Sequence, residues 1–132
     1  MLFRSEEERS IRDKAQSDLS AAEQARTKLT ETLPHYQKQA EAFADLAKDG
    51  YVSRFEAADK QREYTEKSQD LKTQQYLIES AKATLAASNR KLEQISADYR
   101  QRLQAERADL SGKLGQTRAE VTKQQYRNGL LV

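Results

Sequence analysis

The chain has 132 residues, 33% of them charged and 36% hydrophobic, and its 23 basic and 21 acidic residues leave a formal net charge of +2. About half of the residues are Ala, Glu, Lys, Leu or Arg and there is no tryptophan, which excludes a sizeable globular core but suits a narrow seam between long helices. The balanced charge gives no electrostatic footprint for nucleic acid or anionic lipid, the lack of cysteine excludes disulfides and thiolate metal sites, and no apolar run is long enough to span a membrane.

The first predicted helix covers about residues 5–32. Ser5 precedes Glu6-Glu7-Glu8, an arrangement that predicts a helix N-cap followed by an acidic first turn. Apolar residues then recur in steps of three and four, which predicts one stripe on a helix. The stripe consists of Ile11, Ala15, Leu19, Ala22, Ala25, Leu29 and Leu33.

Pro34, the single proline, predicts a break in this arm. Proline inside a helix loses a hydrogen bond and clashes with the preceding turn, whereas it is well tolerated at the first helical position. We therefore expect one helix to end near Thr32 and a second, short helix to cover about residues 34–48. Its apolar stripe is Tyr36, Ala40, Phe43 and Leu46 or Ala47.

A helix stop and a helix start lie a few residues apart in the centre of the chain. Gly50 can adopt the left-handed conformation that closes a helix, and Ser53 followed by Glu56 is a capping box that opens one. The chain is therefore predicted to reverse at residues 49–53. The predicted fold is all-α, an elongated antiparallel coiled-coil hairpin that forms a single domain over residues 1–132.

The returning helix is predicted to run from Arg54 to about Arg127, and its first seam consists of Ala57, Tyr64, Leu71, Ile78, Ala81, Leu85, Ser88, Leu92, Ile95 and Tyr99. A stutter follows Ile95, and a second phase consists of Leu103, Leu110, Leu114, Thr117 and Val121. The arms are unequal, because a turn near residue 51 places residue 1 near residue 101. Residues 102–127 then pair with a further N-terminal helix, pack on another copy of the chain, or fray.

The end of the chain carries helix-weakening residues. Gly112 and Gly115 mark either a bend, a close contact or a weakened C-terminal region. Asn128-Gly129 predicts a helix stop. Leu130-Leu131-Val132 are then expected to be the first residues of a β-strand.

No residue pattern predicts catalysis. His35 is the single histidine and has no partners for metal binding or general base work, so it is interpreted as a surface residue. The four glycines are scattered and form no phosphate-binding loop. A two-helix seam also offers no pocket to perturb a carboxylate. We expect a protein that is not an enzyme and that binds no cofactor, metal, nucleic acid or small-molecule substrate.

The central stretch resembles the HlyD-like periplasmic adaptors, or membrane fusion proteins, of type I secretion systems. The resemblance rests on Leu33-Pro34, on the tip sequence Leu46-Ala-Lys-Asp-Gly-Tyr-Val-Ser-Arg54 and on Arg62-Glu63-Tyr64, with Leu2-Phe3-Arg4-Ser5 similar to a segment upstream of the family's hairpin. In this family a helical hairpin is inserted between the halves of a lipoyl domain. Residues 128–132 look like the return into that domain.

The resemblance implies that the tip docks onto an outer-membrane channel. The wider adaptor family uses an Arg-x3-Leu-x6-Ser motif for this contact; Leu46 and Ser53 match its spacing, whereas Ala42 stands at the arginine position. The expected docking residues are Leu46, Gly50, Tyr51, Val52, Ser53 and Arg54. Ser53 is explained equally well as an N-cap, while Tyr51 and Val52 are apolar residues at a solvent-facing turn, which indicates a contact surface.

The implied function is that of a periplasmic adaptor that bridges an inner-membrane ABC transporter to a TolC-type outer-membrane channel for export of a protein substrate. About six copies are expected to ring the channel, and the inner-membrane anchor is expected outside this sequence. One alternative is a drug-efflux adaptor of the same superfamily, disfavoured by the Leu33-Pro34 break. The other alternative is a cytoplasmic coiled-coil scaffold with no channel partner.

Overall fold

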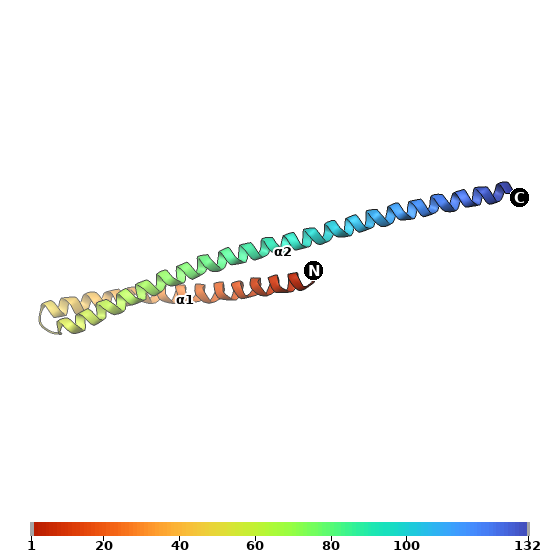
Figure 1. Ribbon diagram of the computed structural model, residues 1–132. Coiled ribbons are helices and arrows are strands. Elements are labelled where there is room, and N and C mark those ends of the chain that lie inside the picture. Colours follow the sequence, from red (N-terminus) through yellow and green to blue (C-terminus); the bar gives the residue numbers. More distant parts are fainter. Residues whose placement is uncertain (1, 132) are drawn as a thin grey trace.

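The computed structural model describes the backbone of residues 2–131 and the side chains of residues 2–129. It contains two helices, α1 (Leu2–Lys48) and α2 (Arg54–Leu131), joined by a turn. No strand occurs in residues 2–131. The helices pack along each other and run in opposite directions, so the N-terminus lies beside the middle of α2 (Figure 1). The predicted all-helical hairpin is confirmed.

The predicted break at Pro34 is wrong, because α1 is one continuous helix that contains this proline. The ring removes one hydrogen bond to the carbonyl of Thr30, but both residues are exposed, so water can satisfy that carbonyl. Seam residues on either side of Pro34 continue to pack: Leu33 and Tyr36 are half-buried, and Ala40 is buried. Packing against α2 therefore outweighs a local cost of about 3 kcal/mol.

The buried side chains form one narrow seam between the helices. Its most buried cluster comprises Leu19, Ala22, Ile78 and Ala81, with Leu85 packed against it. Further buried seam residues are Ala15, Ala40, Ser88 and Ile95. The predicted stripes are therefore largely correct, and the small residues among them allow the two backbones to approach closely.

Polar residues occupy seam positions at both ends of the hairpin. Near the base, Glu8 is 9% exposed and its backbone carbonyl accepts a 2.9 Å hydrogen bond from the Oγ of Ser88, which is 1% exposed. Near the turn, the Lys60 ammonium lies 5.4 Å from the centre of the Phe43 ring, and Lys67 lies 5.7 Å from that of Tyr36. These two cation–π contacts are seven residues apart on each helix. Both contacts therefore share one antiparallel register.

Both ends of the hairpin arms differ from the prediction. The first helix begins at Leu2, ahead of the expected N-cap Ser5. α2 continues through Asn128-Gly129 to Leu131, so the predicted helix stop and the strand expected from Leu130 are wrong. Val132 lies outside the described residues. Gly129 does not adopt a positive φ. An interior glycine weakens a helix without ending it.

The part of α2 that follows Tyr99 has no packing partner from α1. Every side chain from Ser96 to Gly129 is exposed, including those of the predicted second phase. Residues 100–129 are called the extension. The nearest atoms around Gly112 and Gly115 leave room for an added Cβ, so these glycines mark no close contact.

Candidate partner-binding tip

The turn that joins the helices is built by hydrogen bonds from two consecutive amides. Gly50, at φ 78°, donates its N–H to the carbonyl of Ala47 over 3.2 Å, and the N–H of Tyr51 reaches the carbonyl of Leu46 over 2.9 Å. This pair of bonds is a Schellman motif, which satisfies two carbonyls at the end of α1. Gly50 is needed because its positive φ is costly for any residue with a Cβ.

The start of α2 is capped by Ser53. Its Oγ accepts the N–H of Glu56 over 3.0 Å, and the Ser53 carbonyl accepts that of Ala57 over 3.2 Å. The predicted capping box is therefore half formed, because in the described residues the Glu56 carboxylate makes no hydrogen bond back to the Ser53 amide. The two caps satisfy backbone hydrogen-bonding groups at the helix ends and leave Gly50, Tyr51 and Ser53 exposed. The conformation of residues 49–53 is therefore fixed by the backbone hydrogen bonds at the end of α1 and by the Ser53 cap of α2.

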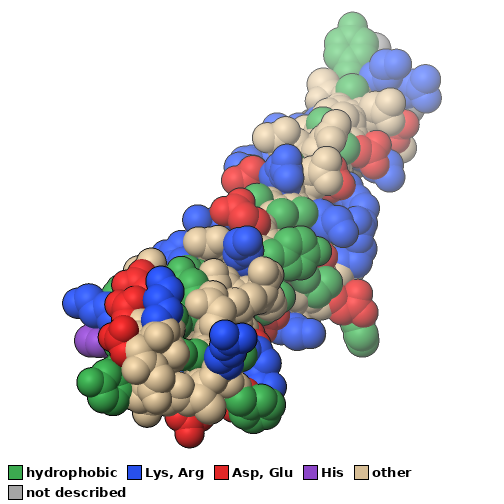
Figure 2. Space-filling model, turned by 90° about the vertical axis from the view of Figure 1, so that its left-hand side faces the viewer, with side chains coloured by type: hydrophobic (Ala, Val, Ile, Leu, Met, Phe, Trp, Pro, Cys, Tyr) green, Lys and Arg blue, Asp and Glu red, His purple; other side chains and the backbone are tan. Residues whose placement is uncertain are grey.

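Large apolar side chains project from this turn. Leu46 is 40% exposed, Tyr51 79% and Phe55 77%. These three residues are called the tip cluster. Between Ile11 and Tyr76 they are the only large hydrophobic side chains that are exposed. Figure 2, which views the molecule from the turn end, shows hydrophobic side chains at the edges of that end.

The other predicted docking residues lie at the same end of the hairpin. Gly50, Ser53 and Arg54 are exposed, whereas Val52 is half-buried and lines a shallow hollow with Phe43. Val52 therefore supports the turn from below as well as facing its surface. Ala42, at the motif's arginine position, is exposed on the last turns of α1.

Phe55 was not among the predicted docking residues. It is the second residue of α2 and lies on the outer side of that helix, away from the seam position of Ala57. The signal was available in the sequence: Phe55 falls outside the apolar spacing that begins at Ala57. A large aromatic residue that no stripe requires, beside a turn, indicates a contact surface.

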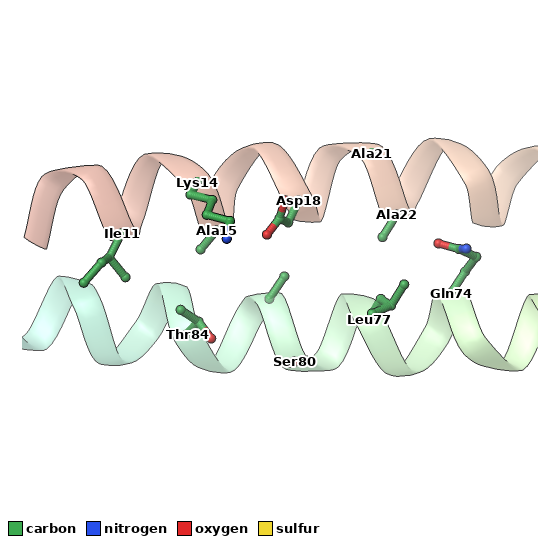
Figure 3. Close-up of a pocket in the computed structure, with 11 residues that line it drawn as sticks. Ile11, Lys14, Ala15, Asp18, Ala21, Ala22, Gln74, Leu77, Ser80 and Thr84 are labelled. Atoms are coloured by element: carbon green, nitrogen blue, oxygen red, sulfur yellow. The ribbon is translucent and has the colours of Figure 1, made fainter.

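The remaining concave surfaces lie along the helices. One open groove runs beside the seam cluster and is lined mainly by small or polar side chains (Figure 3). Its lining residues are Ile11, Lys14, Ala15, Asp18, Ala21, Ala22, Gln74, Leu77, Ser80, Ala81 and Thr84. Among the described residues, no group of three or more His, Asp or Glu side chains is placed to hold a metal ion. Neither helix, over the same residues, combines the length and apolarity that a membrane span requires.

Comparison with known proteins adds no relative. The chain matches no family model, no curated protein and no solved structure.

Proposed function

We propose that this chain is the helical hairpin of a periplasmic adaptor of the HlyD-like class, and that its tip docks onto a TolC-type outer-membrane channel. The observation that carries the proposal is the tip cluster. Exposed Leu46, Tyr51 and Phe55 gather at one end of a long rod, around a turn whose shape is fixed by caps. Exposed apolar residues grouped in this way are typical of a protein–protein contact.

The rod shape fits a bridging role. α2 has 78 residues, which at 1.5 Å per residue is roughly 117 Å of reach. In this proposal the paired part acts as an antiparallel coiled coil that keeps the tip far from its base. The adaptor acts without catalysis or a cofactor, in the periplasm, with an inner-membrane ABC transporter at its base and about six copies around the channel.

The continuous helix through Pro34 removes one reason to prefer a protein-secretion adaptor over a drug-efflux adaptor. The expected break at Leu33-Pro34 was the feature that favoured a protein-secretion adaptor over a drug-efflux adaptor. Since α1 is unbroken there, the proposal rests on the tip residues and their exposure. We still propose a protein-secretion adaptor, because the tip sequence from Leu46 to Arg54 resembles adaptors of type I secretion systems.

The proposal is tested by charged substitutions at the tip. Leu46→Glu and Val52→Glu should abolish export by cells whose copy of the protein carries the change, and should remove binding of the chain to a purified TolC-type channel. Tyr76→Glu is the matched control, because Tyr76 is an aromatic residue that is 71% exposed on the shaft of α2, away from the turn. Circular dichroism should show unchanged helicity in all three variants.

The opposite result would favour the scaffold alternative. If export and channel binding survive both tip changes, the docking role is wrong. Equal losses for the tip variants and for Tyr76→Glu would point to a general surface effect. A drug-efflux adaptor would show the same tip dependence, but with loss of drug resistance in place of loss of a secreted protein.

A further inference from the structure

The extension has its own apolar stripe, which the hairpin leaves uncovered. Leu103 is 45% exposed, Leu110 65%, Leu114 53% and Val121 48%. On a helix with 3.6 residues per turn these four side chains fall within about 40° of one another. They are called the extension stripe. Leu103 and Val121 are 18 positions apart, which is roughly 27 Å of helix.

The extension stripe continues the seam between α1 and α2. Tyr99 lines a hollow with Phe3 and Ile95, where α1 begins, and Leu103 follows Tyr99 by about one helical turn. Ile95 is 7% exposed at this point and Tyr99 is 50% exposed. The surface that α1 covers up to Ile95 therefore runs without interruption onto the extension.

One edge of the extension stripe is basic. Arg100, Arg107 and Arg118 lie along it, and the same edge carries no carboxylate between residues 100 and 129. Among the described residues, none of the three guanidinium groups makes an ion pair. The opposite edge has mixed charge, with Glu106, Lys113 and Glu120. An unpaired arginine edge beside an apolar stripe selects a partner with acidic residues at the matching positions.

A second copy of the chain does not meet that requirement. In an antiparallel pair that matches Leu103 with Val121 and Leu110 with Leu114, Arg107 falls beside Arg118 of the second copy. That arrangement brings like charges together, which disfavours it. A parallel, in-register pair would need the face of α2 that α1 already covers as far as Ile95, so α1 obstructs it.

We propose that the extension stripe is the docking surface for an amphipathic helix that carries an apolar seam and a row of Asp or Glu along one flank. The docked helix lies along α2 in line with α1 and covers Leu103 to Val121, and its acidic row faces the arginine edge. This inference does not depend on the function proposed for the tip. The two surfaces lie at opposite ends of α2.

The test uses two synthetic helical peptides of about 25 residues, long enough to cover the stripe. Both carry the same Leu seam; one has Glu along one flank and the other has Lys at those positions. Binding of each fluorescently labelled peptide to the full chain is measured by anisotropy. The Glu peptide should bind at least about tenfold more tightly than the Lys peptide, and the difference should shrink as salt is added.

Variants of the chain locate the binding surface. The double variant Leu110→Gln and Leu114→Gln should lose at least about tenfold in affinity for the Glu peptide. Arg107→Glu with Arg118→Glu should reverse the preference between the peptides. Tyr126→Gln is the matched control, because Tyr126 is 70% exposed on the extension but lies on the opposite face, and it should leave binding unchanged.

Three results would overturn the proposal. The first is that neither peptide binds, and the second is that both bind equally. The third is a dimer of the chain in sedimentation equilibrium that the Leu110→Gln and Leu114→Gln changes abolish, which would assign the stripe to a second copy. All substitutions are at exposed positions, so circular dichroism should confirm that each variant keeps its helices.

Discussion

Replacing Gly50 with alanine tests the geometry of the turn, because the change lowers the free energy of unfolding in a left-handed turn and raises it in a right-handed helix. Gly50 has φ 78°, and an added Cβ there would meet no atom within 4 Å. The cost of Gly50→Ala is therefore the cost of the left-handed backbone alone, about 1–2 kcal/mol. Asparagine tolerates this conformation better than alanine, so Gly50→Asn should lose less.

Urea unfolding followed by circular dichroism at 222 nm measures this order. With a slope of about 2 kcal/mol per molar urea, the loss for Gly50→Ala corresponds to a midpoint lower by about 0.5–1 M. Stability should fall in the order Gly50, Asn, Ala. If residue 50 instead lay inside a right-handed helix, alanine would be the most stable by about 1 kcal/mol. An Ala variant more stable than the wild type would therefore refute the turn.

The other predictions concern the seam and the helices. Ile78→Ala should lower the free energy of unfolding by about 2–4 kcal/mol in urea titration, because Ile78 is 1% exposed and truncation leaves a cavity; a loss below 1 kcal/mol would contradict this packing. Pro34→Ala should raise stability by up to about 3 kcal/mol, since it restores a hydrogen bond within α1, and a drop in the urea midpoint would show that the proline is needed. Ser88→Ala should cost about 1 kcal/mol more than Ser80→Ala, because only Ser88 donates across the seam, to Glu8; equal effects would show that this bond contributes nothing.

The turn was predictable from the sequence because its signals are local. Gly50 and Ser53 act within one helical turn of themselves, so no long-range contact is needed to read them. Pro34 was misread for the opposite reason. Its local preference for a helix start is real, but it is overruled by seam packing on both sides, which depends on the position of α2.

The polar residues of the seam could not be found by searching only for regularly spaced apolar residues. Glu8 lies seven residues before Ala15, which is buried, and the strict repeat of seven places it in the seam even though its side chain is charged. Ile11, which the apolar spacing favoured, is 46% exposed because it falls one position away from that repeat. Lys60 and Lys67 follow the same rule, since their stems pack in the seam and their ammonium groups lie over aromatic rings. The period of seven, taken regardless of residue type, would have found all three.

The central claim is that the chain doubles back once, and a distance between spin labels tests it most directly. The chain has no cysteine, so Lys14→Cys and Thr84→Cys can be labelled without background, and both residues line the same groove. Pulsed electron–electron double resonance is measured on labelled chain diluted in unlabelled chain. The distance between the two spin labels should be below about 30 Å, because packed helix axes lie 8–10 Å apart. An uninterrupted rod would separate these residues by roughly 105 Å. The absence of a short distance in the diluted sample would contradict the hairpin.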